Sequence, residues 1–200
     1  MKKTTAVAGA YDALAENYAA ENWSSQPSLP SLKEFAASLP VRGRVLDAGC
    51  GAGQDAHYLH RRGFKVTGVE PSRELLKIAR KKVAGVKFMR SGLVEAPLKP
   101  AAFDGVWCNR VFQHVRLQDQ RRFLNKIRRC LKSGGRFYLS LKIAPRRSRE
   151  TVKIEGKMRF PVVFTTFSRL ASLLNRTGFT IERKAAWDVG QMWEFYCRAV

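Results

Sequence analysis

Hydrophobic positions along the chain follow two periods that alternate from one segment to the next. Short apolar runs, typical of buried strands, alternate with stretches in which apolar residues recur every three or four positions, as they do on one face of a helix. The strands are expected at 44–47, 65–69, 86–89, 104–108 and 136–141, and the helices near 9–20, 32–39, 55–62, after 72 and over 117–131. This alternation predicts an α/β fold, in which a parallel sheet is covered by helices on both faces.

The C-terminal part of the chain departs from this alternation. A basic stretch at about 143–160 is expected to be irregular. A leucine-rich helix follows and ends at Gly178, a typical residue for a helix terminus. Two closing strands, at about 179–184 and 192–199, are near enough in sequence to pair as a hairpin.

A glycine-rich turn connects the first strand to the helix that follows it. Glycines occupy alternate positions at Gly49, Gly51 and Gly53, and Asp47 ends the strand before them. Glycine lets the backbone turn tightly and lets a ligand approach the main chain without meeting a Cβ atom. In an open α/β sheet, ligands lie beyond the carboxyl ends of the strands. A dinucleotide-binding turn would have its third glycine where this chain has Gln54, and the Asp47 carboxylate would repel a pyrophosphate.

The second strand ends at an acidic residue, Glu70, directly before Pro71. A carboxylate at this place can accept hydrogen bonds from both hydroxyls of a ribose. Together with Asp47, it predicts a ligand that resembles adenosine and carries a positive charge instead of phosphates. S-adenosylmethionine fits this description. A nicotinamide dehydrogenase is a less favoured interpretation, because Gln54 breaks the dinucleotide pattern.

Five motifs occur in order along nearly the whole chain. They are an N-terminal helix at 11–18, the glycine turn at 47–53, Val69-Glu70-Pro71-Ser72, a fourth-strand motif at 103–109 and a helix-to-fifth-strand motif at 131–137. These motifs resemble those of the class I S-adenosylmethionine-dependent methyltransferases, of the small type 11/25 kind. The resemblance implies a Rossmann-like, doubly wound sheet of seven strands in the order 3-2-1-4-5-7-6, mostly parallel, with strand 7 antiparallel.

The resemblance also implies which residues bind the cofactor, S-adenosylmethionine, and its product S-adenosylhomocysteine. They are Tyr18, Asp47, Gly49, Cys50, Gly51, Gly53, Glu70, Pro71, Gly92, Leu93 and Asn109. Many relatives carry an aspartate after the third strand that binds the adenine amino group, and the corresponding residue here is Gly92. Adenine recognition is then expected to use backbone groups near Ser91, Gly92 and Leu93 and apolar contact with Pro71, which implies weaker cofactor binding.

Methyl transfer from a sulfonium mainly requires that donor and acceptor are held in line and kept dry. A general base helps where the acceptor starts protonated, and His114, after the fourth strand, is the best-placed candidate. The alternative interpretation of His114 is a packing histidine at the start of a helix. Tyr11, Tyr18 and Trp23 form either an aromatic lid that contacts the sulfonium or the plain packing of an amphipathic helix.

Composition limits the class of protein. A chain of 200 residues with 45% hydrophobic residues suits one globular domain. Within it we expect an N-terminal helical lid (1–40), a cofactor-binding half (41–142) and an acceptor-side segment with the closing strands (143–200). Four cysteines without C-x-x-C spacing favour a reduced, cytoplasmic protein that has no disulfide or metal site. The first residues do not form a signal peptide, and no apolar run is long enough to span a membrane.

The acceptor is the least defined feature. The chain has 37 Lys and Arg against 16 Asp and Glu, a net charge of +21, and residues 142–159 hold seven basic and two acidic residues. The proline motif of base-amino methyltransferases does not follow Asn109, and no cysteine has the context that cytosine C5 methylation needs. We therefore expect a small metabolite as acceptor, anionic if the basic segment lines its pocket. RNA bound by the basic surface is the first alternative. A non-catalytic S-adenosylmethionine-binding protein is the second, and a basic surface without a function remains open.

Overall fold

The computed structural model describes residues 4–26, 28–155, 158–186 and 192–200. The chain divides into two compact units, which comprise Met1–Pro97 and Leu98–Val200. The expected single domain with internal boundaries near 40 and 142 stays a prediction.

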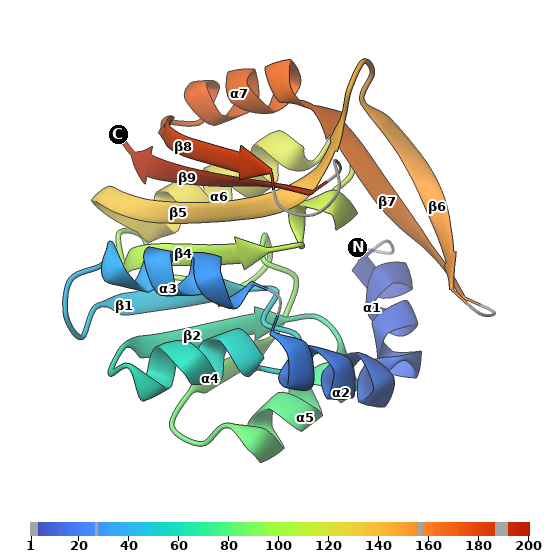
Figure 1. The fold of residues 1–200 in the computed structure, drawn as a ribbon, viewed down its shortest axis with the longest axis vertical. Coiled ribbons are helices and arrows are strands. Elements are labelled where there is room, and N and C mark those ends of the chain that lie inside the picture. Colours follow the sequence, from blue (N-terminus) through green and yellow to red (C-terminus); the bar gives the residue numbers. More distant parts are fainter. Residues whose placement is uncertain (1–3, 27, 156–157, 187–191) are drawn as a thin grey trace. The chain divides into compact units, whose positions relative to one another are not determined.

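The first unit is built on three parallel strands. Its elements are α1 (Thr4–Ala13), α2 (Ala15–Ser25), α3 (Leu29–Ala37), β1 (Arg44–Ala48), α4 (Gln54–Arg61), β2 (Lys65–Glu70), α5 (Arg73–Lys82) and β3 (Lys87–Arg90). β2 lies between β1 and β3, with Asp47 beside Gly68 and Val69 beside Met89. Figure 1 shows α3 across β1 and α4 across β2. The predicted alternation of strands and helices from β1 to β3 is therefore confirmed.

α5 shows how local sequence sets these elements. Ser72 is its N-cap, and the Oγ of Ser72 accepts a hydrogen bond of 3.2 Å from the backbone N–H of Leu75. Leu75, Leu76 and Ala79 are buried at the spacing of one helix face. Each buried leucine stabilises the fold by roughly 2 kcal/mol. α5 therefore packs firmly on β2 and β3 and fixes the turn that follows β2.

The N-terminal region contains two helices, whereas one was predicted over 9–20. The break lies at Leu14, whose backbone angles (φ −101°, ψ 4°) fall outside the helical values. Its cause is tertiary and leaves no local signal in the sequence. Asp12 binds the first turn of α5, while Ala15 and Ala19 pack into an apolar cluster beside the glycine turn.

The second unit contains the other six described strands of the sheet. Its elements are β4 (Phe103–Asn109), a 3-10 helix η1 (Phe112–His114), α6 (Gln120–Cys130), β5 (Leu131–Ala144), β6 (Arg149–Glu155), β7 (Met158–Thr166), α7 (Phe167–Arg176), β8 (Phe179–Ala186) and β9 (Met192–Ala199). β4 is parallel to β5, and β9 runs antiparallel to both β5 and β8. The closing hairpin predicted from the sequence is confirmed. β9 lies between β5 and β8 and is antiparallel to both. If β8 and β9 are counted as strands 6 and 7, this arrangement matches the implied order 4-5-7-6 with strand 7 antiparallel.

The prediction that residues 143–160 are irregular was wrong. β6 and β7 form an antiparallel hairpin, and the end of β7 joins β5 in parallel, with Ile143 beside Thr165. Figure 1 shows this hairpin extending past the end of β5. Its strands contain β-branched residues such as Val152 and Val162, but the frequent Arg and Lys between 142 and 159 hide that pattern. Over the described residues the strands number nine rather than seven, and this hairpin supplies the additional two.

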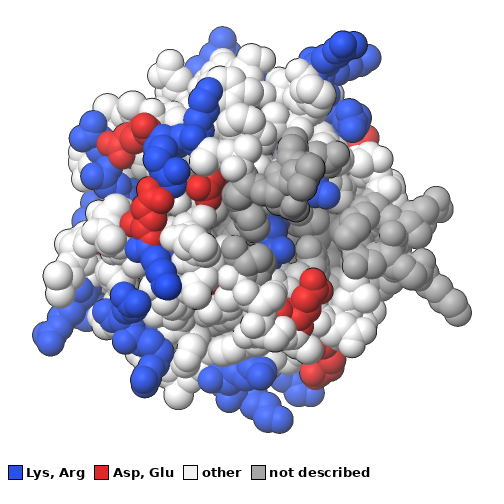
Figure 2. Space-filling model, viewed as in Figure 1, with Lys and Arg blue, Asp and Glu red and all other residues white. Residues whose placement is uncertain are grey.

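Several general properties follow from the described residues. All four cysteines are buried thiols. No group of His, Cys, Asp and Glu side chains in these residues is placed to hold a metal ion. Likewise, no helix among them has the length and apolarity needed to cross a membrane. Figure 2 shows Lys and Arg spread over the visible surface and few areas of Asp and Glu, as the net charge of +21 requires.

Candidate functional site

The glycine turn lies at the carboxyl end of β1 and is pinned to the neighbouring strand. The backbone N–H groups of Gly49 and Cys50 donate to the carbonyl oxygen of Val69, at 2.8 and 3.1 Å. Gly49, Gly51 and Gly53 have φ values of 82°, 51° and 86°, in the left-handed region that favours glycine. The alternate glycines are therefore needed for the path of the backbone, and they leave its surface without side chains.

Glu70, at the end of β2, is bound to this turn. The N–H of Gly51 donates to its Oε2 (3.2 Å) and the N–H of Ser72 donates to its Oε1 (2.8 Å). A carboxylate offers about four acceptor positions, so about two remain for the hydroxyls of a ribose. Glu70 is 7% exposed. Burial raises its pKa to about 7, against the lowering effect of the two N–H donors, and repulsion from Asp12 adds to the rise.

Two further carboxylates lie under the turn. Asp47 is 2% exposed, and its Oδ2 has no hydrogen-bond partner among the described residues. Burial, and then repulsion from Asp55 and Glu70, raise the pKa of Asp47 well above its usual range. Asp55, in the first turn of α4, is also buried. A buried acidic cluster of this kind favours a ligand with positive charge, which fits a sulfonium or ammonium group and not a pyrophosphate.

We expect the ligand-free protein to lose stability as the pH rises from about 4.5 to about 7. In this interval folded Glu70 keeps a proton that an unfolded glutamate releases, because its pKa is about 7 and the ordinary value is 4.5. The stabilisation is complete below about pH 4.5 and is lost as the pH rises through the folded pKa. The shift corresponds to about 3 kcal/mol, and Asp47 acts in the same direction.

Urea unfolding at about pH 5 and about pH 8 measures this difference. Glu70→Gln removes the titrating carboxyl of Glu70 and should reduce the difference between the two free energies of unfolding. A free energy of unfolding that increases over this interval in the unmodified protein would contradict the assignment.

The N-terminal helices cover the turn with aromatic side chains. A Cβ atom at Gly51 would lie 3.5 Å from Cε1 of Tyr18, so the Tyr18 ring lies beside the bare backbone. Tyr11 contacts Tyr18 edge to face, with ring centroids 5.3 Å apart. Trp23 donates its indole N–H to the carbonyl oxygen of Ala52 (3.1 Å). All three aromatic residues also pack against the apolar cluster beside the turn, so the lid and the packing interpretations are compatible.

Asp12 holds these helices to the Glu70 turn and was missed by sequence reasoning. Its Oδ1 accepts hydrogen bonds from Ser72 Oγ (2.5 Å) and from the N–H of Glu74 (3.0 Å). Burial raises the pKa of Asp12, but these donors outweigh it and the net pKa is lowered. No local signal identifies Asp12, because its partners are 60 and 62 residues away.

The segment after β3 contains Ser91, Gly92 and Leu93, which the sequence analysis expects beside the adenine. The N–H of Ser91 donates to the carbonyl oxygen of Glu70 (3.2 Å), and the N–H of Ala96 donates to that of Gly92 (3.0 Å). Leu93 is buried, and Pro71 is half-buried. Gly92 therefore lies in a short ordered turn that begins beside the end of β2.

Asn109 and His114 belong to the second unit. The Oδ1 of Asn109 accepts a hydrogen bond from Ser140 Oγ (2.8 Å), which itself accepts one from the N–H of Arg110 (2.8 Å). Arg110 has a φ of 58°, unusual for a residue other than glycine and frequent at functional sites. Neither the left-handed backbone of Arg110 nor the hydrogen bonds of Ser140 could be predicted from the local sequence.

His114 has a defined orientation. Its Nδ1 lies 3.2 Å from the carbonyl oxygen of Pro161 on β7. A carbonyl oxygen can only accept, so Nδ1 donates this hydrogen bond, and in the neutral imidazole the lone pair is then on Nε2. The neighbouring segment is fixed by Glu150 on β6, which accepts a hydrogen bond from the N–H of Leu117 (2.8 Å). The hairpin of β6 and β7 therefore holds the imidazole of His114 through its Nδ1.

Comparison with known proteins adds independent information. A family model described as "Methyltransferase domain" matches residues 46–139, which include the glycine turn and Glu70. The chain is 35% identical over 133 residues to a malonyl-[acyl-carrier protein] O-methyltransferase of Enterobacter lignolyticus, over 65% of this chain and 51% of the relative. It is 34% identical over 115 residues to a ubiquinone biosynthesis O-methyltransferase of Xylella fastidiosa, over 54% of this chain and 46% of that protein. The chain thus spans about half the length of these curated relatives.

A solved structure agrees with the fold. The 1,6-didemethyltoxoflavin-N1-methyltransferase of Burkholderia thailandensis, crystallised with 1,6-didemethyltoxoflavin and S-adenosylhomocysteine, superposes with a TM-score of 0.69. The match covers 93% of this chain and 87% of that one at 22% sequence identity. Identity at this level supports the fold alone.

Proposed function

We propose that this chain, which belongs to the class I S-adenosylmethionine-dependent methyltransferases, binds S-adenosylmethionine and transfers its methyl group to a small organic acceptor. The observation that carries the proposal is the contact between the glycine turn and Glu70. There, bare backbone, an ordered carboxylate with acceptor positions to spare and a buried acidic cluster occur together. This combination suits a nucleoside with a cationic arm.

The roles of the binding residues follow from their chemistry. We assign the ribose hydroxyls to Glu70 and the cationic arm to the field of Asp47. The other proposed contacts to the cofactor are Tyr18, Gly49, Cys50, Gly51, Gly53, Pro71, Gly92, Leu93 and Asn109. Since Gly92 has no side chain, the adenine amino group would be bound by backbone groups, and the affinity should be lower than in relatives with an aspartate there.

The proposed mechanism is an in-line displacement. When bound, S-adenosylmethionine supplies a methyl group on a positively charged sulfur, which is a good leaving group. The chain has to hold the acceptor on the line of that bond and exclude water, a task that suits the aromatic side chains of Tyr11 and Tyr18. His114 acts as general base: its Nε2 takes the proton of the acceptor as the new bond to carbon forms, while Pro161 holds the ring by Nδ1.

The acceptor is proposed to be a small metabolite. The names of the relatives give no support to an RNA acceptor, which was the first alternative. Calorimetric titration with S-adenosylhomocysteine and transfer of a labelled methyl group to a panel of small acids, phenols and amines test the proposal together. We expect saturable binding and transfer to at least one acceptor. Binding without any transfer would instead favour the non-catalytic alternative, and transfer to RNA alone would restore that acceptor.

Replacing His114 by Gln should lower kcat by about a hundredfold for an acceptor that must lose a proton, because this is a typical contribution of a general base. Binding of S-adenosylhomocysteine should stay within about twofold. The loss should be absent for an acceptor that carries no proton on its reacting atom, because no base is then required.

The matched control for this experiment is His57→Gln, which removes a second half-buried histidine, one whose ring lies near Trp23. It should leave kcat unchanged for both kinds of acceptor. If His114→Gln lowers kcat equally for both kinds of acceptor, then His114 has a packing role and is not the base.

A further inference from the structure

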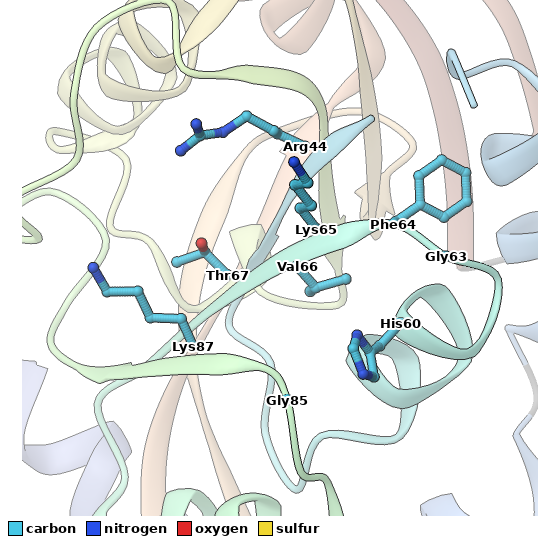
Figure 3. Close-up of a pocket in the computed structure, with 9 residues that line it drawn as sticks. All are labelled: Arg44, His60, Gly63, Phe64, Lys65, Val66, Thr67, Gly85 and Lys87. Atoms are coloured by element: carbon cyan, nitrogen blue, oxygen red, sulfur yellow. The ribbon is translucent and has the colours of Figure 1, made fainter. Parts of the chain in front are cut away.

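A hollow of about 410 Å³ lies at the opposite end of the first unit's strands from the proposed cofactor site. Its walls come from the amino-terminal ends of β1, β2 and β3 and from the end of α4 (Figure 3). The volume is in the range of small-molecule sites. The distance along β2 from this end to Glu70 is about 16 Å, at about 3.3 Å per residue. A ligand here would therefore not compete with one at Glu70.

Three of the lining residues are cations at the starts of neighbouring strands. Arg44 is paired with Lys65, and Thr67 is paired with Lys87. Directly paired residues of parallel strands share a face of the sheet, and so do residues two apart on one strand. These four side chains therefore lie on the same face, and Figure 3 shows them pointing to the same side of β2. Since neighbouring strands are about 4.8 Å apart, one ligand of modest size can reach all four.

The charged side chains that line the hollow are all positive. None of the lining residues is acidic. Lys65 and Lys87 are exposed, and within the described part of the chain neither forms an ion pair. Lys65 and Lys87 therefore offer two cations to a ligand at the starts of adjacent strands. In contrast, the buried carboxylates of this unit, including Asp47 and Glu70, lie at the other end of the strands.

The remaining wall combines His60 with two apolar side chains, Phe64 and Val66, and with the backbone of two glycines. His60, in the last turn of α4, lies against the turn before β3, because a Cβ atom at Gly85 would be 2.7 Å from its Nε2. The hydroxyl of Thr67 adds hydrogen-bonding capacity to the three cations, whereas the His60 imidazole lies on the other side of β2 (Figure 3). Arginine binds phosphate oxygens in a two-pronged manner, and lysine binds them as a point charge. An anion with two or more charges uses this set better than a single carboxylate does.

We propose that this hollow, lined by Arg44, Lys65, Thr67 and Lys87, is a second ligand site that binds a phosphate-bearing anion, such as the diphosphate group of a small molecule. The site is separate from the proposed methyl-transfer site and does not depend on that assignment. Its occupancy is independent of whether a nucleoside is bound at the carboxyl ends of the strands.

Calorimetric titration of the full chain with inorganic pyrophosphate at low ionic strength tests the proposal. We expect one saturable site. The double variant Lys65→Glu/Lys87→Glu should weaken binding by at least about tenfold, as expected for two exposed cation–anion contacts. The control Lys33→Glu/Lys99→Glu makes the same change in net charge at exposed positions outside the hollow, and it should change the affinity by less than about twofold.

Parallel titrations with S-adenosylhomocysteine and with a single-stranded oligoribonucleotide complete the design. Unchanged S-adenosylhomocysteine binding in the Lys65→Glu/Lys87→Glu variant shows that the variant is folded and separates this proposal from the proposed function. Pyrophosphate that fails to bind the unmodified protein would overturn the proposal. So would a control variant that loses as much affinity as the Lys65→Glu/Lys87→Glu variant, or an oligoribonucleotide that binds through these lysines while pyrophosphate does not.

Discussion

Glu70→Ala is expected to weaken the binding of S-adenosylhomocysteine by about a thousandfold. In the proposed complex the carboxylate accepts hydrogen bonds from two ribose hydroxyls. Hydrogen bonds to a charged group contribute about 1.5–3 kcal/mol each. Their loss together amounts to about 4 kcal/mol, which is about a factor of a thousand in the dissociation constant. Calorimetric titration at about pH 8, where Glu70 is ionised, measures the change.

The same substitution should have little effect on the stability of the ligand-free protein. It leaves the N–H groups of Gly51 and Ser72 without their acceptor, at a cost of about 1–3 kcal/mol each. It also removes a buried charge whose ionisation costs about 3 kcal/mol at this pH, as the raised pKa of Glu70 indicates. These contributions largely cancel. A large loss of affinity with an almost unchanged midpoint of thermal unfolding is therefore the result that identifies Glu70 as a binding residue.

Glu21→Gln is the matched control, because Glu21 is an exposed carboxylate on α2. It should leave both the affinity and the midpoint unchanged. An affinity of Glu70→Ala within about threefold of the unmodified protein would remove Glu70 from the site. It would also weaken the proposed function, since the contact between Glu70 and the glycine turn is its main support.

The parts of the site that could be predicted from the sequence are those in which neighbouring residues carry the signal. The spacing of Gly49, Gly51 and Gly53 reports the path of one turn, and Glu70 directly follows a strand that is apolar enough to recognise. The strands and helices of the first unit were predictable for the same reason, because burial on one face imposes a period on the sequence.

The parts that could not be predicted depend on partners far along the chain. Asp12 is 60 residues from Ser72, and His114 is 47 residues from Pro161. The break between α1 and α2 belongs to the same class, because Asp12 binds α5 there. In these cases the local sequence allows several conformations, and a distant hydrogen bond selects one. The hairpin of β6 and β7 is different, because its strands are neighbours in sequence, and the many basic residues between 142 and 159 hid its strand pattern.

Gly53→Ala is expected to lower the free energy of unfolding by about 4 kcal/mol. Gly53 has a φ of 86°, and a residue with a Cβ atom pays about 1–2 kcal/mol in this region. The new Cβ would also lie 3.0 Å from the Cβ and 3.3 Å from the Cα of Ala79 on α5. Because Ala79 Cα belongs to the helix backbone, α5 would have to shift, and crowding of this kind costs about 1–3 kcal/mol.

Two other glycines of the first unit separate these two contributions. Gly63 has a φ of 88° but no atom within 4 Å of an added Cβ, so Gly63→Ala should cost only the conformational part, about 1–2 kcal/mol. Gly9 lies in α1, also with open space around the added Cβ, and Gly9→Ala should stabilise the helix by about 0.5–1 kcal/mol. Urea unfolding of the three variants at one pH gives the comparison.

The difference between Gly53→Ala and Gly63→Ala measures the close approach of the turn to α5. Equal losses in the two variants would mean that α5 yields without cost and that only the backbone angle requires glycine at Gly53. A larger loss in Gly53→Ala than in Gly63→Ala would mean that the glycines of the turn after β1 are required for different reasons. Glycine at Gly53 is then required by packing against Ala79, whereas at Gly51 an added Cβ would meet only the Tyr18 side chain at ordinary contact distance. Gly53 therefore keeps the helix close enough to hold the turn, while Gly51 leaves the backbone bare at the proposed cofactor contact.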